Sequence, residues 1–347
     1  KLRLSWGQTG NADISTNAFA SYGAQGSWIN SEYKTISGVM KSRLENPDLK
    51  WETTTEWNLG LDFGFLKSRI TGSVELYQRV ISDLLNYKPL NSYQEVIMAN
   101  VGKTQSRGVE ITLNSRNIIT NNFFWETSLT YTKYEDRWKE RTPDWKPNVY
   151  EKEKDPIRAI YARRADHIMQ IGEKAPAAQP DLRPGQIVIK DLDGYVRDEN
   201  GNPKVDQNGR FMLLGHADGT IDEADTQLIG TQDPGWMASM TNTFKYKGFD
   251  LNIMFNGMFD RIMQDPTEMD FGLNGGNIAQ NGSNMLRIIK DRWTFDNPST
   301  TRPSSYYTSG TKYTAGDFFY QKAWFIRLQN ISLGYTLPKS IFELVKT

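Results

Sequence analysis

Residues 57–65 alternate strictly between apolar side chains and polar or small ones. The apolar positions are Trp57, Leu59, Leu61, Phe63 and Phe65, and the positions between them are Asn58, Gly60, Asp62 and Gly64. A period of two over nine residues predicts a β-strand with one apolar and one polar face, long enough to cross a bilayer when tilted. After a turn at residues 67–69 the alternation resumes from Ile70, which predicts a β-hairpin.

The same alternation recurs along the chain, and it predicts about eight strands: residues 1–8, 52–66, 69–87, 105–118, 123–138, 236–246, 248–261 and 318–336. The connections between them alternate in length. Four are long (9–51, 88–104, 139–235 and 262–317), and three are short (67–68, 119–122 and 247). Outer-membrane barrels have short periplasmic turns and long extracellular loops, whereas a soluble β-sandwich has no reason to lengthen every second loop. The sequence therefore predicts an all-β, transmembrane antiparallel β-barrel with long extracellular loops.

Composition agrees with this class. No stretch approaches 18 consecutive apolar residues, which excludes a helical membrane protein. The 41 basic residues balance 41 acidic ones, so no long-range field favours nucleic acid. Cysteine is absent, which excludes thiolate chemistry and Cys-ligated metals. Aromatic residues near strand ends are expected to form girdles at the two membrane interfaces, although aromatic residues are common in any β-sheet. These residues are Trp51, Trp57, Tyr87, Trp138, Trp236, Tyr246 and Trp324.

The polar face of the predicted strands carries large and charged residues: Glu56, Asn58, Asp62, Glu75, Glu110, Asn114 and Glu126. An eight-stranded barrel is so narrow that side chains fill its interior. A set this large and charged therefore predicts an arc of a wide, water-filled barrel, and a complete small barrel without a transport role is the alternative.

Five segments, in order along the chain, resemble the SusC/RagA family of TonB-dependent outer-membrane transporters. They are LSWGQTGN at residues 4–11, NPDLKWETT at 46–54, NVG with RGVE at 100–110, YKGFDL at 246–251 and RLQNISLGY at 327–335. The resemblance implies that residues 1–347 form the C-terminal part of a barrel of about 22 strands. The plug domain and the first and last strands are then expected to lie outside this chain.

The resemblance also implies a function and partners. Members of this family actively import a glycan, oligosaccharide or peptide across the outer membrane. A SusD-like surface lipoprotein closes the extracellular mouth, and the TonB–ExbB–ExbD complex supplies energy. The expected location is the cell outer membrane, in contact with its lipid, and no enzymatic activity or nucleic-acid binding is expected.

Two acidic segments of the 139–235 loop together match a twelve-residue calcium loop. Asp191-Leu-Asp193-Gly supplies positions one to four, and residues 218–225 supply positions five to twelve. The expected oxygen ligands are Asp191, Asp193, Asp218, the Thr220 carbonyl, Asp222 and Asp225, with Gly219 at the sharp turn. A 23-residue insertion, Tyr195–Ala217, separates the halves and is expected to form a hairpin. The sequence thus predicts a structural Ca²⁺ in an extracellular loop; the alternative is that these Asp-Gly pairs are ordinary turn formers.

Other functional classes have weaker support. Carboxylate pairs such as Glu56 with Asp62 resemble a glycosidase pair, but 41 acidic residues produce such pairs by chance. The main alternative function is a secreted, soluble, β-rich carbohydrate-binding or carbohydrate-cleaving protein. Leu59, Leu61 and Phe63 decide between the two, because they face lipid in a barrel and a second sheet in a soluble protein.

Overall fold

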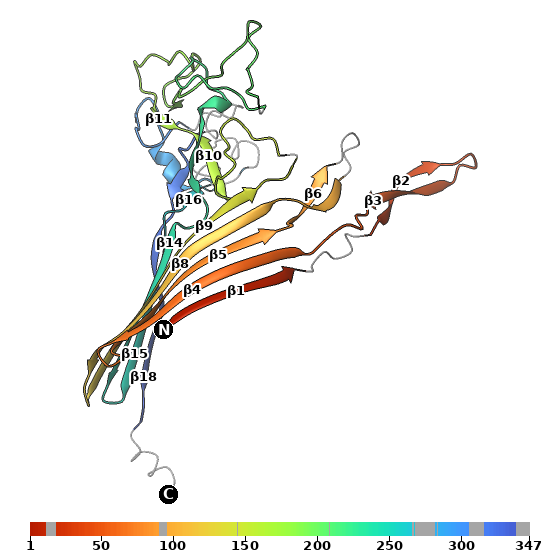
Figure 1. Ribbon diagram of the computed structural model, residues 1–347. Coiled ribbons are helices and arrows are strands. Elements are labelled where there is room, and N and C mark those ends of the chain that lie inside the picture. Colours follow the sequence, from red (N-terminus) through yellow and green to blue (C-terminus); the bar gives the residue numbers. More distant parts are fainter. Residues whose placement is uncertain are drawn as a thin grey trace.

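The computed structural model describes residues 1–11, 19–89, 96–143, 145–207, 209–265, 284–304 and 316–337, together with residues 267 and 282. Eight long strands form one antiparallel sheet in the order β1-β4-β5-β8-β9-β14-β15-β18 (Figure 1). Their bounds are β1 Leu2–Asn11, β4 Glu52–Phe65, β5 Ile70–Ser82, β8 Lys103–Ile119, β9 Phe123–Glu140, β14 Trp236–Tyr246, β15 Phe249–Phe259 and β18 Phe325–Tyr335. All eight predicted strands are present, and each pairs with its expected neighbours.

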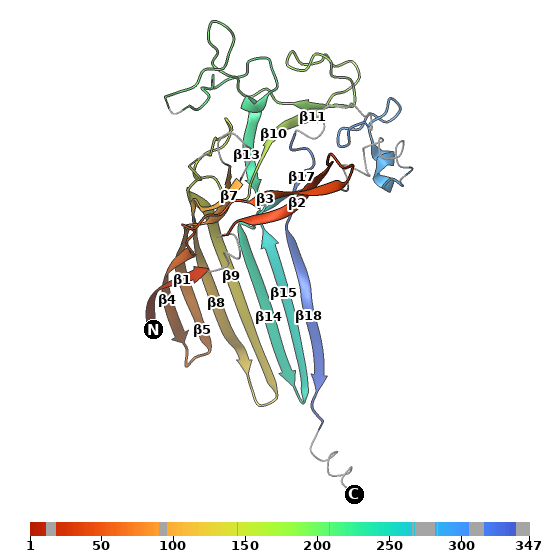
Figure 2. The ribbon, with the colours of Figure 1, turned by 90° about the vertical axis from the view of Figure 1, so that its right-hand side faces the viewer.

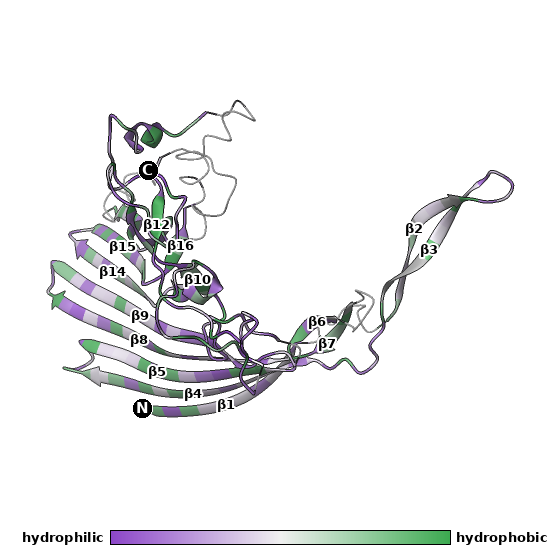
Figure 3. Ribbon diagram, turned by 90° about the horizontal axis from the view of Figure 1, so that it is seen from above, coloured by the Kyte–Doolittle hydropathy of each residue, from purple (hydrophilic) through white to green (hydrophobic). Residues whose placement is uncertain are grey.

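The register assigns one apolar and one polar face to the sheet. Leu4, Leu59, Leu76 and Val109 lie opposite one another across β1, β4, β5 and β8 and form one apolar row. Residues one position along each strand point to the opposite face, and the colouring of Figure 3 shows this alternation along the strands. We call the two sides the apolar face and the polar face.

The apolar face is not covered by other parts of the described chain. Leu59 and Leu61 are 41% and 47% exposed, and the other sheets that the structure describes are two-stranded pairs of the connecting segments. Within the described residues, the buried apolar side chains all belong to the connections: Val101, Ile160, Ala162, Ile168, Met169, Leu182, Ile187, Val188, Ile189, Ala224, Trp293 and Phe319. A soluble sandwich would bury its apolar sheet face instead. The prediction that Leu59 and Leu61 face outward is confirmed.

The sheet curves but does not close within the described residues. Of the eight long strands, β1 pairs with β4 alone and β18 pairs with β15 alone, and the views in Figures 1 and 3 show an open arc. A barrel removes such edges by closing on itself. The arc therefore matches part of a wide barrel and not a complete eight-stranded one.

Aromatic rings mark both limits of the apolar face. At the end where the long connections leave, Trp6 packs on Trp57 with 6.2 Å between ring centroids, and Trp236 stacks on Phe259 at 3.8 Å. At the short-turn end, Phe249 packs on Tyr335 at 4.5 Å. The eleven residues of β14 cover about 26 Å along the axis of a barrel whose strands tilt by about 40°. That height matches the apolar band of an outer-membrane barrel, about 25 Å.

The predicted girdle is confirmed for only part of its residues. Trp57, Trp236, Tyr246 and Trp324 lie at the limits of the apolar face. The other three, Trp51, Tyr87 and Trp138, do not: Trp51 packs beside Gly10, Tyr87 lies in a connecting hairpin, and Trp138 shares the polar face.

One row of the apolar face carries polar side chains in place of apolar ones. Asn242 accepts hydrogen bonds from the Trp125 indole (3.0 Å) and the Thr127 hydroxyl (2.7 Å), and Asn117 donates to the same hydroxyl (2.8 Å). These groups satisfy one another across β8, β9 and β14, which lowers the cost of placing them among apolar neighbours.

The segments that join the long strands contain short paired strands, and the sequence did not predict these pairings. They hold the pairs β2–β3 (Ser21–Ile29, Thr35–Arg43), β6–β7 (Leu85–Pro89, Val96–Asn100), β10–β13 (Ala159–Arg163, Thr226–Thr231), β11–β12 (Ala165–Ile168, Ile187–Ile189) and β16–β17 (Ile262–Gln264, Tyr320–Lys322), and the 3₁₀ helices η2 (Glu223–Asp225) and η4 (Arg287–Asp291). Figure 2 shows these elements gathered at one end of the sheet. The described residues contain no helix long and apolar enough to cross a membrane.

Two predicted strands are shorter than expected. The strand predicted over residues 69–87 ends at Ser82, because Asp83 adopts a left-handed conformation (φ 57°) that breaks the extended chain. The strand predicted over 318–336 is divided into β17 and β18. Most of the connection 262–317 lies outside the described residues.

The turn between β14 and β15 has only two residues, Lys247 and Gly248, both with positive φ (45° and 88°). This is the backbone of a type I′ turn, which matches the right-handed twist of the strands. We expect Gly248→Ala to lower the free energy of unfolding by about 1–2 kcal/mol. A Cβ there would also lie 3.1 Å from the Thr336 carbonyl oxygen.

The urea midpoint of the complete receptor in lipid vesicles measures this effect. Lys247→Gly is the matched control, because it changes the neighbouring residue of the same turn toward the residue that positive φ favours. We expect the control to be neutral or stabilising. Equal destabilisation by both changes would contradict the backbone explanation.

Candidate functional site

A charged network ties β1, β4 and β5 together on the polar face. The Arg3 guanidinium donates from Nε and Nη2 to the Asp62 carboxylate (2.9 and 2.7 Å) and from Nη2 to Glu75 (2.9 Å). Asn58 donates to the second oxygen of Glu75 (3.2 Å). Alternation predicted the positions of Asn58, Asp62 and Glu75, but it did not identify Arg3 as their partner.

The rest of the polar face carries charges of both signs. Arg79 donates to Glu56 (2.7 Å), Arg116 pairs with Glu126 (3.4 Å), and the Thr130 and Ser239 hydroxyls share a hydrogen bond (2.7 Å). The register places all seven predicted polar residues on this face, including Glu110 opposite Glu75 and Asn114 opposite Ser128. A surface of this kind is stable only in contact with water or polar partners, so the face can line an aqueous passage.

Packing on the polar face also depends on a glycine. The Tyr77 ring lies across Gly108 on the neighbouring strand, where a Cβ would come within 2.7 Å of the Tyr77 hydroxyl and of the Lys133 carbonyl. Glycine therefore leaves room for a large ring between β5 and β9.

The structure brings the two halves of the predicted calcium loop together. Asp191 accepts hydrogen bonds from the amides of Asp218 (3.2 Å) and Gly219 (2.7 Å), 27 and 28 residues away. The fully buried Asp225 accepts from the amides of Leu192 (2.7 Å), Asp193 (3.3 Å) and Asp222 (2.8 Å). Gly219 has φ 87°, as the sharp turn at the sixth position requires. The sequence pattern thus identified a genuine structural unit across the insertion.

The acidic side chains of this loop are used mainly to bind backbone amides. Asp193 accepts from Gly194 and Gly215, Asp218 accepts from Thr220, and Asp222 accepts from Ala224. Within the described part of the chain, no three acidic or histidine side chains are grouped closely enough to hold a metal ion. The described geometry is that of a loop closed by carboxylate–amide hydrogen bonds, and Ca²⁺ binding stays a prediction.

The insertion between the two halves folds back on itself. Its returning segment pairs with the outgoing one through Val196 N–H to Met212 O and Leu214 N–H to Gly194 O, both 2.9 Å. A middle segment joins them, because Lys204 N–H donates to Val196 O (2.8 Å). The insertion is therefore three short paired segments and not the two-stranded hairpin that the sequence predicted.

His167 joins two carboxylates in the same region. Its ring nitrogens lie 2.9 Å from Asp166 and 2.6 Å from Glu173, and Lys190 also pairs with Asp166 (3.1 Å). Hydrogen bonds to Asp166 and then to Glu173 raise the pKa of His167 above its ordinary value. Because the folded pKa is raised, the stabilisation is complete below the unfolded value near 6.5 and is lost as pH rises through the folded pKa.

This pH dependence can be measured as a difference between two proteins. We expect the melting temperature of the complete receptor to exceed that of the His167→Gln variant at pH 6, and the gap to shrink as pH rises toward 8.5. The effect should be modest, because the His167 side chain is 42% exposed and solvent screens its ion pairs. A gap that stays constant with pH would show that His167 acts only through packing.

Comparison with known proteins shows which proteins this chain is similar to. Residues 1–163, which contain β1, β4, β5, β8 and β9, match the family model "TonB dependent receptor-like, beta-barrel". The TonB-dependent receptor SusC of Bacteroides thetaiotaomicron is 28% identical over 97% of this chain and 31% of its own length. The TonB-dependent receptor P3 of Formosa agariphila is 26% identical over 98% of this chain and 32% of its own length. The chain thus spans about a third of the length of these relatives.

A solved structure agrees on the fold. The chain superposes on the structure described as the RagAB peptide transporter with a TM-score of 0.71, at 22% identity, over 98% of this chain and 35% of that one. The open arc of eight strands, its apolar outer face and its polar inner face are therefore those of one part of a larger barrel. Residues 1–163 thus match the β-barrel model of the TonB-dependent receptors, and the chain is a homologue of SusC whose long strands form part of an outer-membrane β-barrel.

Proposed function

We propose that this chain forms part of the lumen wall and extracellular surface of a TonB-dependent importer of a glycan, oligosaccharide or peptide. The polar face lines the passage, and the long connections bind cargo or the partner outside. Energy comes from the TonB–ExbB–ExbD complex, and a SusD-like lipoprotein covers the long connections. The 1–347 segment supplies the C-terminal strands of the barrel in this proposal, and transport requires no covalent step.

One observation carries the proposal: the sheet has an apolar band on its outside and a polar face with charges of both signs on its inside. A barrel with no transport role needs no water-lined interior, whereas Arg3, Asp62 and Glu75 would suit a passage that stays hydrated. The kinship to SusC, and a fold like that of a peptide transporter, support import as the use of that passage.

Uptake by cells that carry the complete receptor tests this function. We expect labelled oligosaccharides or peptides to accumulate in the periplasm, and accumulation to stop when TonB is deleted or the proton gradient is collapsed. A surface lipoprotein should co-purify with the receptor in detergent. Accumulation that persists without TonB would refute active import.

We also propose that the loop formed by residues 191–194 and 218–225 binds Ca²⁺ as a structural ion. The close approach of the two halves and the left-handed Gly219 support this proposal. Calorimetry of the complete receptor after chelation should give heat on adding CaCl₂, and Asp191→Asn should reduce it. Asp181→Asn, outside the loop, is the control. The absence of calcium-dependent heat would refute the proposal.

A further inference from the structure

A charged band lies on the lipid-facing side of the sheet, directly above its apolar band. Trp6, Trp57, Gln78, Arg107 and Glu135 lie opposite one another across five strands and form one outward row. The Trp6–Trp57 pair is part of the aromatic girdle, so this row lies at the level of the membrane interface. Lys133 and Arg137 lie two positions before and two positions after Glu135 on β9, so they also point outward.

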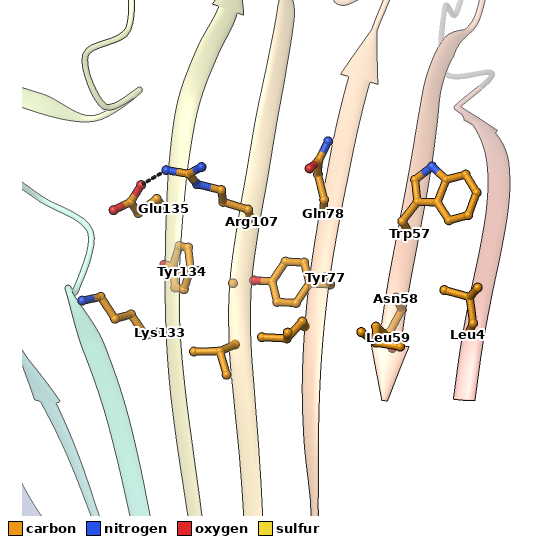
Figure 4. Close-up of a pocket in the computed structure, with 13 residues that line it drawn as sticks. Leu4, Trp57, Asn58, Leu59, Tyr77, Gln78, Arg107, Lys133, Tyr134 and Glu135 are labelled. Carbon is orange, nitrogen blue, oxygen red and sulfur yellow. Dashed lines mark hydrogen bonds and ion pairs between the residues drawn. The ribbon is translucent and has the colours of Figure 1, made fainter. Parts of the chain in front are cut away.

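Positive charge exceeds negative charge in this band. Arg107 and Arg137 both contact the Glu135 carboxylate, at 3.2 and 3.3 Å, and Figure 4 shows the Arg107–Glu135 pair. Lys133 is exposed and makes no ion pair with the described part of the chain. Three cations and one anion leave about two positive charges directed toward the headgroup region. Arg107, Lys133 and Glu135 line a pocket of about 490 Å³.

An apolar groove of about 610 Å³ continues below the charged band. The small residues Ala238 and Gly257 form its floor, and Tyr131, Trp236 and Ile111 stand around them. Tyr131 and Lys133 are two residues apart on the same face of β9, as are Ile111 and Val109 on β8, so the groove and the charged pocket adjoin. The surface is therefore amphipathic over a continuous path from the interface into the bilayer.

We propose that this surface binds a phosphorylated, acylated lipid of the outer leaflet. The phosphate lies between Lys133 and Arg107, and an acyl chain occupies the groove over Ala238 and Gly257. The charge favours an anionic headgroup, and the depth of the groove in the apolar band favours an acyl chain over a protein segment. The assignment to the outer leaflet rests on the proposed function, in which the long connections lie outside the cell.

Binding can be measured with the complete receptor in detergent by native mass spectrometry. The probe is diphosphorylated lipid A, and dephosphorylated lipid A and inorganic phosphate are the comparison ligands. We expect lipid A to bind more tightly than either. The double variant Arg107→Gln/Lys133→Gln should weaken lipid A binding about 30-fold, because each basic residue near a charged lipid contributes a factor of about five. Ala238→Trp, which fills the groove, should also weaken it.

Arg116→Gln is the matched control, because Arg116 pairs with Glu126 on the polar face. Equal binding of the dephosphorylated lipid, or unchanged binding by the double variant, would overturn the proposal. If inorganic phosphate competes as strongly as lipid A does, the groove has no role in binding, and the proposal is overturned as well. A protein that co-purifies with the wild type but not with the double variant, without lipid A binding, would replace the lipid with a protein partner. Cargo uptake by the double variant should be unchanged, so failure of this proposal is distinguishable from failure of the import function.

Discussion

Val74→Arg is expected to lower the free energy of unfolding of the complete receptor in lipid vesicles by about 2–4 kcal/mol. Val74 lies between Leu61 and Ile111 in the middle of the apolar face. A guanidinium placed there must enter hydrocarbon or pull water and headgroups toward it, and both cost free energy. The urea concentration at the unfolding midpoint, measured by tryptophan fluorescence and by heat-modifiable gel mobility, gives the size of the effect.

Ser73→Arg is the matched control, because Ser73 is the preceding residue on the same strand and faces the lumen. Its register partners are Asp62 and Thr112, and Asp62 belongs to the charged network around Arg3. A new guanidinium in this hydrated and partly acidic wall should change stability by less than about 1 kcal/mol. Comparable destabilisation by both variants would contradict the assignment of lipid and lumen to the two faces.

The sheet could be predicted from sequence because a barrel strand has a strong period-two signal. The long strands alternate over most of their length, as in residues 57–65, and the lipid imposes the same apolar requirement on each of them. The pairs inside the long connections could not be predicted in this way. β10 (Ala159–Arg163) is buried at alternate positions, but its partner β13 lies more than 60 residues later and no local turn links them. β12 (Ile187–Ile189) is buried throughout and has only three residues.

The polar wall could be predicted only as a list of positions. Alternation placed Asp62 and Glu75 on the inner face, but their partner Arg3 lies 59 and 72 residues away on β1, and alternation within one strand does not identify ion pairs between strands. The contact between the two halves of the acidic loop could be predicted from sequence. The spacing of Asp and Gly in residues 191–194 matches the first four positions of a calcium loop, and the spacing in residues 218–225 matches the remaining eight. That spacing predicts Asp225 as a metal ligand. It did not reveal that the Asp225 carboxylate binds three backbone amides.

The role of Asp225 leads to the second large effect, which concerns the extracellular region and not the barrel. Asp225 is fully buried, and its two oxygens accept hydrogen bonds from the amides of Leu192, Asp193 and Asp222. Asp225→Ala would leave those amides without an acceptor, at about 1–3 kcal/mol for each buried group that water does not reach. We expect at least about 3 kcal/mol of local destabilisation, which opens the junction between residues 191–194 and 218–225. Hydrogen exchange of the Leu192 and Asp222 amides in the complete receptor should accelerate by a hundredfold or more.

Asp198→Ala tests whether the large effect expected for Asp225→Ala requires burial of the carboxylate or only the loss of its hydrogen bonds to backbone amides. Asp198 also accepts from backbone amides, those of Asn200 (2.9 Å) and Asn202 (2.8 Å), but it is only partly buried, at a turn of the insertion. Water can replace its oxygens, so this variant should cost less than about 1 kcal/mol. Both measurements belong in excess EDTA, because a Ca²⁺ ion bound to the loop would add its own contribution. If Asp225→Ala leaves exchange unchanged in EDTA but accelerates it in CaCl₂, the carboxylate acts through the ion. A large effect in EDTA establishes that the buried carboxylate–amide bonds alone hold the two halves together.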